Sequence, residues 1–423
     1  MSILTDHSFA LNQDLDDPLR SIRDRYHIPL DKNGKEYVYL CGNSLGLQHI
    51  NAKAYVQKEL DRWASLGVKG HFEGDTPWAT YQDDLVAHTT RLVGALPGEV
   101  TIMNTLSVNI HMMLVSFYRP LGKRNKILIE WTPFPSDMYA LKSHIRLRGL
   151  DPRDVLIELK PRQGEYILRE EDIIQTILKY QDSLALVYFG SVNYLNGQVY
   201  TLPSIIHAAH ASGSLIGFDL AHGAGNIELD LHTWNADFAI WCHYKYLNGG
   251  PNCLAGCFIH QSHFKDEHMQ RLEGWWGHDK NRRFLMEPDF IAMPGVEAWQ
   301  VSGPPTFSLA GMKAALEDFE EIGMQALRKK SEALTSYLYS LIQDIRDPRL
   351  TIITPSEVDD RGCQLSMLLT PADKKIFYAL LDQGIIVDWR EPGIIRVAPV
   401  PLYNSFEDVY IFAERFASIL KAL

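Results

Sequence analysis

A lysine and an aspartate that each follow an apolar run are the residues of this chain best suited to covalent chemistry. Lys245 stands between Tyr244 and Tyr246, and Asp219 ends the run that begins at Leu215. A lysine amine can hold the aldehyde of pyridoxal phosphate (PLP) as a Schiff base, while an aspartate keeps the pyridine nitrogen protonated. Each residue alone more often means a surface lysine or a helix-capping aspartate. Together, at the ends of expected strands, they favour a PLP site.

Short β-rich runs alternate with helical stretches between about residue 97 and 260, and these elements would position the pair. We expect strands at Val100–Met103, Ile127–Trp131, Val155–Leu159, Leu184–Gly190, Leu215–Asp219, Asp237–Trp241 and Leu254–His260. Near-continuous apolar strands separated by helices predict a mostly parallel sheet that is covered on both faces. Ligands of such sheets bind at the carboxyl ends of the strands, where Asp219 and Lys245 would lie.

The pattern changes after Pro304-Pro305, which indicates a second domain in a chain of 423 residues. A long helical stretch from Ser308 to about Ile345 precedes weaker strands and a last helix that opens at Ser405 with a capping-box pattern. We expect a large PLP-binding domain at residues 51–305 and a smaller C-terminal α/β domain at 306–423. Residues 1–50 would contribute to the small domain and to the active site.

Composition and charge exclude several classes of function. The net charge of −11 and the lack of a basic stripe argue against nucleic acid as a partner, although a local cationic pocket remains compatible. Cys253 and Cys257 lack a second ligand pair, and His207 and His210 lack a third ligand, so we predict no metal site. We see no signal peptide and no apolar stretch long enough to span a bilayer, and we expect a cytoplasmic enzyme.

Two turns that follow expected strands suit the remainder of a cofactor. Ser107 opens a helix after the run 100–103, and free N–H groups at a helix start attract a phosphate. Phe134 and Asp137, in a Phe-Pro-Ser-Asp turn, offer an aromatic ring to stack on the pyridine and a carboxylate beside it. Such residues more often form a plain helix cap and an ordinary turn. A cofactor site is the better interpretation of both turns only because Lys245 already suggests PLP.

Ser44 and Arg396 suit two further kinds of chemistry. Gly42-Asn43-Ser44-Leu45-Gly46 matches the G-x-S-x-G pattern of a hydrolase nucleophile, but it precedes the main alternation and no oxyanion-hole glycine run comes before it. We therefore interpret it as a loop that makes backbone contacts. Arg396 follows a strand of the small domain, where its guanidinium could grip an α-carboxylate with two hydrogen bonds.

The chain closely resembles the kynureninase family in six segments that occur in order and at the family's spacing. They are Gly42–Gly46, Phe134–Asp137, Asp219–His222, Tyr244–Asn248, Gly274–His278 and Arg396–Asn404. The resemblance runs from about residue 37 to 415 and implies a fold-type-I PLP enzyme with a mostly parallel, seven-stranded sheet. The implied reaction is hydrolysis of L-kynurenine or 3-hydroxy-L-kynurenine to anthranilate or 3-hydroxyanthranilate and L-alanine, in tryptophan catabolism and the NAD-related kynurenine pathway.

The resemblance also implies a role for each matched residue. Lys245 would form the Schiff base and move protons at the substrate α-carbon, Asp219 would pair with the pyridinium, and Tyr244 is the candidate acid or base of later steps. The implied cofactor contacts are Leu106, Ser107, Phe134, Pro135, Ser136, Asp137, Asp219, His222, Tyr244, Lys245, Trp275 and Gly303. The implied substrate contacts are Arg396, His71, Ser302, Asn43 and Ser44. Because Trp275 and position 303 reach the neighbouring subunit's site in this family, a homodimer with shared active sites is expected.

Two positions depart from the family pattern. Gly190 stands where a serine or threonine usually contacts the cofactor, and Ser191 is the candidate substitute. Gly303 stands where animal members have an asparagine that recognises the aromatic ring of the substrate, whereas His71 and Ser302 match the animal type. We favour 3-hydroxykynurenine as the better substrate, because a histidine could hydrogen-bond its ring hydroxyl.

Three other functions fit parts of this pattern. A cysteine desulfurase shares the PLP fold but needs a reactive cysteine on a mobile loop, and none of the five cysteines has an obvious position of that kind. A serine hydrolase would use Ser44. A PLP-binding protein without turnover is the third alternative.

Overall fold

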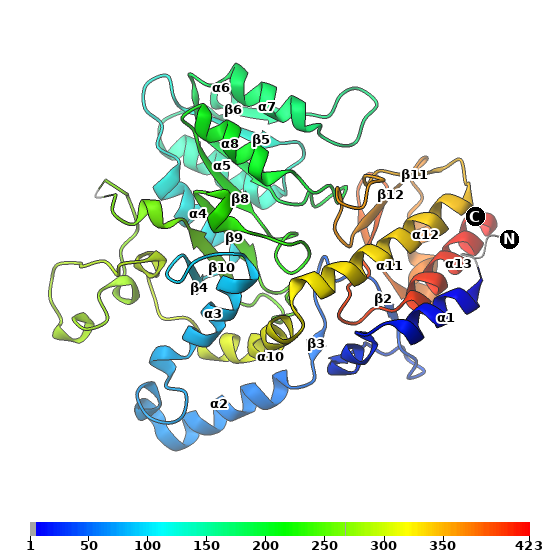
Figure 1. The fold of residues 1–423 in the computed structure, drawn as a ribbon, viewed down its shortest axis with the longest axis horizontal. Helices are drawn as coiled ribbons and strands as arrows, with labels where there is room; N and C mark the ends of the chain where they lie inside the picture. Colours follow the sequence, from blue (N-terminus) through cyan, green and yellow to red (C-terminus); the bar gives the residue numbers. More distant parts are fainter. Residues whose placement is uncertain (1–5, 267) are drawn as a thin grey trace.

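Two groups of helices and strands lie beside each other in the computed structural model, which describes residues 6–266 and 268–423 (Figure 1). The larger group surrounds a seven-stranded sheet, and the smaller group surrounds a four-stranded sheet near both ends of the chain. None of the helices in the described part of the chain is both long and apolar enough to cross a membrane.

The large sheet confirms the predicted α/β class and its mostly parallel pattern. Its strands are β4 (Val100–Met103), β5 (Lys126–Glu130), β6 (Leu156–Leu159), β7 (Leu184–Gly190), β8 (Leu215–Asp219), β9 (Phe238–Cys242) and β10 (Ala255–Ile259). They are arranged in the order β4-β10-β9-β8-β7-β5-β6. Only β10 runs antiparallel to its neighbours, β4 and β9. The expected strand at 155–159 begins one residue later, because Val155 ends a short helix.

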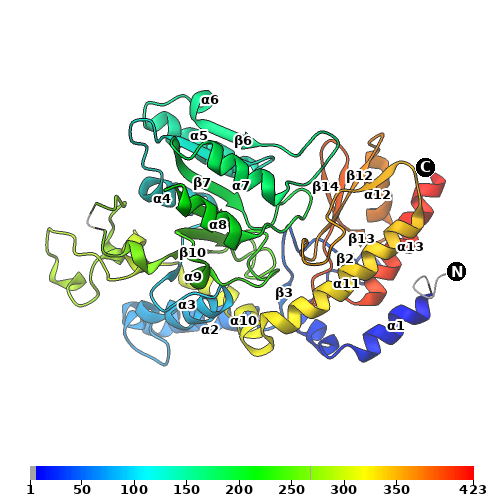
Figure 2. The ribbon, with the colours of Figure 1, turned by 45° about the horizontal axis from the view of Figure 1, so that its top comes forward.

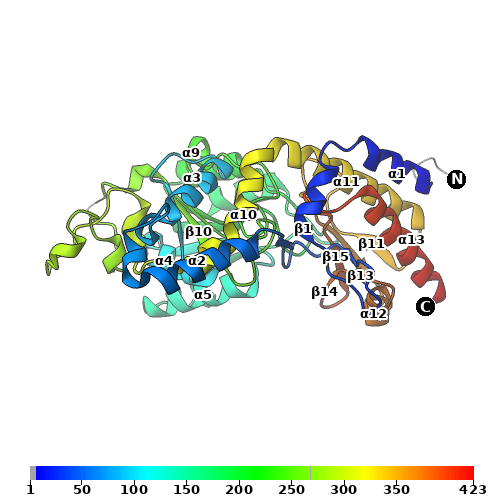
Figure 3. The same cartoon turned by 90° about the horizontal axis from the view of Figure 1, so that it is seen from below.

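Helices cover both faces of this sheet, as the near-continuous apolar strands predict. On β5, Leu128 packs into one core cluster with Ile205, whereas Ile127 and Ile129 pack into another with Leu141. The helices of the two faces are α4 (Leu106–Phe117) with α5 (Pro135–Leu147), and α7 (Glu170–Lys179) with α8 (Leu202–Ala211). Seen from below, α4 and α5 lie on one side of the sheet and α9 (Leu231–Trp234) on the other (Figure 3).

The smaller group combines the C-terminal third of the chain with the N-terminal segment (Figure 2). Its antiparallel sheet has the order β11-β12-β15-β14, formed by Leu350–Ile352, Leu365–Leu369, Ile394–Val397 and Asp388–Arg390. Helix α12 (Lys374–Asp382) and helix α13 (Phe406–Ala422) pack with it, and the predicted capping box at Ser405 is present. Helix α1 (His7–Asp16) contacts α13, and β2 (Val38–Tyr39) pairs in parallel with β13 (Ile385–Ile386).

The prediction of one long helix from Ser308 to Ile345 is wrong. Two helices, α10 (Thr306–Ile322) and α11 (Met324–Ile345), meet at Gly323, whose φ of 79° no helix interior permits. Helix α10 packs against α2 (Ala52–Leu66) and α3 (Gln82–Leu92) of the larger group, while α11 packs against α13. The remaining short elements are α6 (Pro152–Val155), β1 (Tyr26–His27), β3 (Gln48–His49), η2 (Arg20–Arg25), η3 (Gly67–His71), η4 (Trp78–Thr80), η5 (Gln261–His263), η6 (Trp275–Gly277), η7 (Arg283–Leu285) and η8 (Val296–Trp299).

Candidate active site

Asp219 and Lys245 meet at the carboxyl end of the large sheet. Asp219 is the last residue of β8, and Lys245 follows the end of the neighbouring parallel strand β9 by three residues. The backbone N–H of Ala221 donates to Asp219 Oδ1 over 2.7 Å, which orients the carboxylate. Because open α/β sheets bind ligands at this edge, the position of the pair agrees with a cofactor site.

One cavity contains most of the cofactor contacts that the family resemblance implies. Its predicted members are Leu106, Phe134, Asp137, Asp219, His222, Tyr244 and Lys245, and its other lining residues are Glu130, Pro133, Tyr188, Gly190, Val192, Tyr194 and Ala221. These side chains come from the ends of β5, β7, β8 and β9 and from the starts of α4 and α5. A lysine, a carboxylate, a histidine and an aromatic ring therefore share one enclosed space.

His222 is the direct neighbour of the Lys245 amine. Its Nε2 lies 3.0 Å from Lys245 Nζ, and its buried Nδ1 has no hydrogen-bond partner in the described protein. Burial, together with the positive charge of Lys245, holds the pKa of His222 well below its usual value. The imidazole is therefore neutral and accepts a hydrogen bond from the lysine amine. Lys245 Nζ also lies 5.8 Å from the centroid of the Phe134 ring.

Two buried aspartates face each other beneath this amine. Burial raises the pKa of Asp219, although the positive charge of Lys245 opposes the shift. Burial and the neighbouring Asp219 carboxylate raise the pKa of Asp137 well above its usual value. Tyr188 donates to Asp137 Oδ1 over 2.8 Å. The two carboxyl groups therefore lie side by side, and a charge on one disfavours a charge on the other.

Glu130 explains the departure at Gly190. A Cβ atom at Gly190 would lie 2.8 Å from Glu130 Oε1, which accepts the Gly190 N–H over 2.9 Å. Burial raises the pKa of Glu130. The Ser191 hydroxyl is buried without a partner and points toward Gly223, where an added Cβ would lie 2.1 Å from it. A carboxyl group, and not Ser191, thus fills the space beside Gly190.

The starts of α4 and α5 converge beside the cavity. The hydroxyl oxygens of Ser107 and Ser136 lie 2.5 Å apart, and Pro135 occupies the first turn of α5. Thr105 precedes α4 with extended backbone geometry, so Ser107 is the second helical residue and not the capping residue. Free N–H groups of two helices and two hydroxyls therefore gather at one point, as a bound phosphate requires.

Arg396 reaches the cavity wall from the small sheet. Its guanidinium is buried, forms an ion pair with Asp388 and donates to the Tyr194 carbonyl over 2.6 Å. Ser44 donates to the same carboxylate, Asp388 Oδ2, over 3.2 Å, whereas Asn43 donates to a small-domain glutamine, Gln364, over 2.8 Å. Within the described residues the Ser44 hydroxyl contacts no histidine by hydrogen bond, and this argues against a serine nucleophile.

Four predicted residues lie away from the cavity of this chain. His71 and Trp275 are exposed, and aromatic contacts through Phe72 and Phe284 connect them across one surface. Ser302 and Gly303 are also exposed, and a Cβ at Gly303 would lie 3.2 Å from the Trp276 ring. One chain alone does not bring these residues to Lys245.

The sequence interpretation missed four residues of the site, namely Glu130, Tyr188, Tyr194 and Asp388. Glu130 carried a usable signal, because it is a carboxylate that ends an otherwise apolar parallel strand. Tyr188 also lies in a buried strand, where a phenol needs a hydrogen-bond partner. Asp388 pairs with Arg396 across two strands of the small sheet, whereas the approach of Tyr194 to Arg396 depends on how the two sheets meet, which no local pattern reveals.

The residues of the cavity fit pyridoxal phosphate. A lysine amine and a half-buried carboxylate line the same cavity, a neutral histidine has a buried nitrogen without a hydrogen-bond partner, and the Phe134 ring borders the same space. Two helix starts at its rim offer donors to a phosphate. This donor set agrees with an aldehyde cofactor that carries a pyridinium and a phosphate.

Solved structures with the same fold define the class of this protein. The apo structure of a cysteine desulfurase from Thermococcus onnurineus has a TM-score of 0.78 at 16% identity, covering 95% of this chain and 98% of that chain. A cysteine desulfurase from Escherichia coli has a TM-score of 0.76 at 15% identity, covering 96% and 99%. The chain therefore has the fold of these two enzymes, fold type I, and the Lys245 cavity lies at the carboxyl end of its large sheet.

Sequence comparison shows the family within this class. A relative from Myxococcus xanthus named kynureninase is 53% identical over 96% of each chain, and one from Koribacter versatilis is 48% identical over 98% of each chain. A relative from Flavobacterium psychrophilum is 46% identical over 96% of each chain. The family model described as the kynureninase C-terminal domain matches residues 327–416. The chain belongs to the kynureninase family of PLP-dependent enzymes.

The cysteines differ from what a desulfurase needs, despite the shared fold. Cys242, Cys253, Cys257 and Cys363 are buried, and Cys41 is partly buried. Burial raises the pKa of the Cys41 thiol to about 12 and that of Cys363 to about 12. Thiols with such pKa values are protonated at neutral pH and are poor nucleophiles.

Proposed function

We propose that the Lys245 cavity carries out the hydrolysis of L-kynurenine, with or without a 3-hydroxyl group, to the corresponding anthranilate and L-alanine. Family membership and the joint position of Lys245 and Asp219 at neighbouring strand ends support this reaction. The bound cofactor supplies an electron sink for the substrate carbon atoms next to its nitrogen. The residues of this chain then bind the substrate, orient it and move protons.

Lys245 and Asp219 have the central roles in this proposal. The Lys245 amine holds the cofactor and moves a proton at the substrate α-carbon, and neutral His222 keeps the amine in place through the 3.0 Å contact. Asp219 pairs with the pyridine nitrogen and keeps it protonated. Protonated Asp137 donates to Asp219 and leaves the negative charge on the carboxylate that faces the ring.

Tyr244 is the proposed acid for the later steps. It lines the cavity next to Lys245, and burial raises the pKa of its phenol, so the phenol keeps its proton at neutral pH. A protonated phenol can donate to the carbon released by cleavage of the Cβ–Cγ bond, which completes L-alanine. Leu106, Ser107, Pro135 and Ser136 bind the phosphate end, and Phe134 packs against the ring.

Arg396 is the proposed clamp for the substrate α-carboxylate. Its guanidinium is now neutralised by Asp388, whose carboxylate also accepts hydrogen bonds from Ser44 and Arg390. When a substrate carboxylate takes the Arg396 fork, Ser44 and Arg390 remain as partners of Asp388, so the exchange leaves no buried charge unpaired. Asn43 holds the loop that carries Ser44 through its contact with Gln364.

A homodimer would complete the site. His71, Trp275, Ser302 and Gly303 are exposed in one chain, and exposed apolar side chains surround the first two. The apolar side chains are Val68, Phe72, Phe284, Leu285 and Met286, between 59% and 78% exposed. Such a surface is typical of a protein interface.

We also propose that each chain is divided into a PLP-binding domain at 51–305, a small domain at 306–423 and a segment at 1–50 that joins the small domain.

Substrate preference depends on the residues brought by the second chain. His71 can accept or donate a hydrogen bond to a 3-hydroxyl group, and Ser302 adds a second polar side chain. Gly303 adds none, and the Trp276 ring leaves little room for one. We propose 3-hydroxy-L-kynurenine as the better substrate.

A competition assay tests the reaction and the preference together. PLP-loaded protein receives equal L-kynurenine and 3-hydroxy-L-kynurenine, and both anthranilate products are quantified against L-alanine. We expect both products in amounts that match alanine, with 3-hydroxyanthranilate in excess. An excess of anthranilate would overturn the preference, and no product from protein that still shows the absorbance of lysine-bound cofactor would overturn the reaction.

Lys245→Ala is the matched negative control. It should remove the visible absorbance of the lysine-bound cofactor and lower activity by about 10³-fold or more, because it removes both covalent attachment and proton transfer. Lys142→Ala, at a surface lysine of α5, should change neither property. Ser44→Ala should leave the cofactor absorbance intact. Loss of all turnover in Ser44→Ala without any cofactor signal in the parent protein would favour a serine hydrolase.

A further inference from the structure

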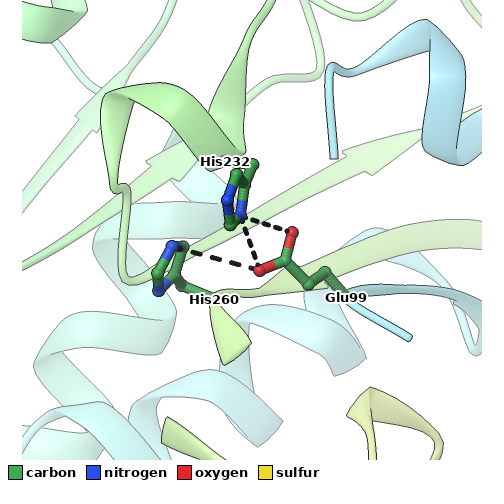
Figure 4. Close-up of side chains that lie close together, drawn as sticks. All are labelled: Glu99, His232 and His260. Carbon is green, nitrogen blue, oxygen red and sulfur yellow. Dashed lines mark hydrogen bonds and ion pairs between the residues drawn. The ribbon is translucent and has the colours of Figure 1, made fainter. Parts of the chain in front are cut away.

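Three side chains that are distant in sequence meet at the end of the large sheet opposite Lys245. Glu99 directly precedes β4, His260 directly follows β10, and His232 lies in α9. Because β10 is antiparallel to β4 and β9, its end lies beside their starts. The N–H of Ile259 donates to the Glu99 carbonyl over 2.9 Å, which fixes this junction. Figure 4 shows both imidazole rings beside the Glu99 carboxylate.

The potential ligand atoms of these residues face one another. His232 Nδ1 lies 3.0 Å from Glu99 Oε1 and 3.1 Å from Oε2, and His260 Nε2 lies 4.0 Å from Oε1. One ligand atom from each residue lies within 4.8 Å of the other two, and no other three His, Cys, Asp or Glu residues in the described ranges do this. The two rings stack with centroids 5.0 Å apart.

This spacing suits a metal ion better than a set of hydrogen bonds. A tetrahedral ion with bonds of 2.0–2.1 Å separates its ligand atoms by roughly 3.3–3.5 Å. The 3.0 Å and 4.0 Å separations lie on either side of that range, so small side-chain shifts would seat an ion. The contact of His260 is too long for a hydrogen bond, yet its nitrogen faces the carboxylate.

Surrounding groups hold the ligands in the required orientation. The Glu99 carboxylate is fully buried and accepts the N–H groups of Leu96 over 2.8 Å and of Gln261 over 2.9 Å. A carboxylate offers about four acceptor positions, so two remain for an ion. His260 Nδ1 lies 2.8 Å from the Ser262 hydroxyl and 3.3 Å from the Ser262 backbone nitrogen, and Nε2 can bind an ion when Nδ1 carries the ring proton and donates it to the hydroxyl. The His232 side chain is 27% exposed, so water can supply a fourth ligand.

A nearby carboxylate shows what an ordinary arrangement looks like. Asp237 contacts His210 through Oδ2 over 3.0 Å and His263 through Oδ1 over 2.7 Å. Each histidine there makes a hydrogen bond of normal length to its own oxygen. The Glu99 group differs, because both histidine nitrogens face one oxygen and one of them stands beyond hydrogen-bond distance.

We propose that Glu99, His232 and His260 bind one divalent transition-metal ion, with Zn²⁺ as the physiological ion. Imidazole and carboxylate ligands suit this ion, and a site with three protein ligands leaves one position for water. The ion would tie the start of β4, the end of β10 and α9 together at the edge of the sheet. It serves the fold and lies at the end of the sheet that does not carry Lys245.

Cobalt binding to the untagged, chelator-treated holoenzyme tests this proposal. Co²⁺ is added, the d–d absorption of four-coordinate cobalt is recorded beyond the cofactor bands, and the bound metal is counted per chain. We expect one saturable equivalent that Zn²⁺ displaces. His232→Gln, which leaves the backbone contacts of Glu99 intact, should weaken binding by more than about 10-fold. His207→Gln is the matched control, at an exposed histidine on the neighbouring helix α8, and should bind as the parent does.

Each other outcome would overturn the proposal. Absence of saturable binding to the parent holoenzyme, or equal binding to His232→Gln, would show that these three residues hold no ion. Glu99→Gln provides a second variant, and retained absorbance of the lysine-bound cofactor shows that each variant is folded. Heating with and without Zn²⁺ adds a readout of stability, since Zn²⁺ should raise the unfolding midpoint of the parent and of His207→Gln but not of His232→Gln.

Discussion

The pKa values of carboxyl groups at the two ends of the large sheet are shifted in opposite directions. At the carboxyl end, Asp137 and Asp219 face each other, and burial raises the pKa of both groups. At the other end, burial would raise the pKa of Asp237, but hydrogen bonds from His210 and His263 outweigh it and leave the pKa lowered. The same sheet therefore disfavours negative charge on a pair of carboxyl groups at one end and stabilises a paired carboxylate at the other.

This difference in pKa shift separates carboxyl groups that take part in the reaction from carboxyl groups that stabilise the fold. A group with a raised pKa and few partners is ready to exchange a proton or meet a cationic ligand, and such groups cluster at active sites. Asp237 instead gains stability from its hydrogen bonds with His210, His263 and the N–H of Ile216. The following predictions test this division.

Among the carboxylate variants compared here, Asp219→Asn should produce the largest effect on activity. An amide cannot provide the negative charge that keeps a pyridine nitrogen protonated, so kcat should fall by about 10²-fold or more while the fold is retained. Steady-state kinetics and the visible spectrum of the holoenzyme measure this change. Asp219→Glu keeps the charge and should lose less. Equal loss in both variants would mean that shape, and not charge, is what the site requires.

Asp237→Asn should lower stability and leave the chemistry intact. The substitution removes the charge that His210 and His263 share, and we expect the free energy of unfolding to fall by about 2–3 kcal/mol. Urea unfolding of the holoenzyme measures it, and kcat at a temperature where both proteins are folded should match the parent. A large fall in kcat with unchanged stability would contradict the division between the two ends.

The His210–Asp237 pair should stabilise the protein most between about pH 4 and pH 6.5. A hydrogen bond to Asp237 raises the pKa of His210 above its usual 6.5, so its contribution is complete below 6.5 and is lost as the pH rises through the folded value. The pKa of Asp237 is lowered, so its contribution holds above the usual 3.8 and is lost as the pH falls further. The stability difference between the parent and His210→Gln, measured across pH, should therefore peak in this window. If the difference in the free energy of unfolding between the two proteins grew toward pH 9, the predicted pH dependence would have the wrong sign.

Asp137→Asn should have the smallest effect. In the proposed mechanism Asp137 is the protonated member of the pair, so an amide can replace it, donate to Asp219 and accept from Tyr188. We expect kcat within about threefold of the parent. Asp137→Leu, which removes both hydrogen bonds, is the contrasting variant. If Asp137→Asn were as inactive as Asp219→Asn, Asp137 would be the charged member of the pair.

Local sequence patterns were sufficient for most of the fold and for the centre of the site. The strand at 184–190 is one continuous apolar run, and it was found with its bounds. Lys245 and Asp219 follow such runs, so their joint position follows from the parallel sheet. The break at Gly323 was missed, because glycine within a helical pattern is often tolerated and only its positive φ ends the helix.

The remaining features depend on contacts between distant segments. Arg396 and Asp388 are both in the small sheet, but the approach of Arg396 to Tyr194 depends on how the two sheets meet. Glu99 and His260 meet only because β10 runs antiparallel to β4, and no local sequence pattern predicts this direction. His71 and Trp275 do not line the cavity of their own chain, and family resemblance is the only source of the roles proposed for them.

The reversed strand also affects the order in which the sheet can be completed. Strand β4 is an edge strand whose single partner, β10, lies about 150 residues later in the chain. Closing a loop of this length is slow during folding. Until β10 pairs with it, β4 (Val-Thr-Ile-Met) therefore has unpaired backbone N–H and C=O groups. An unpaired edge strand in a partly folded chain pairs readily with strands of other chains. Refolding yield should therefore fall as protein concentration rises, even for variants whose native state is as stable as the parent.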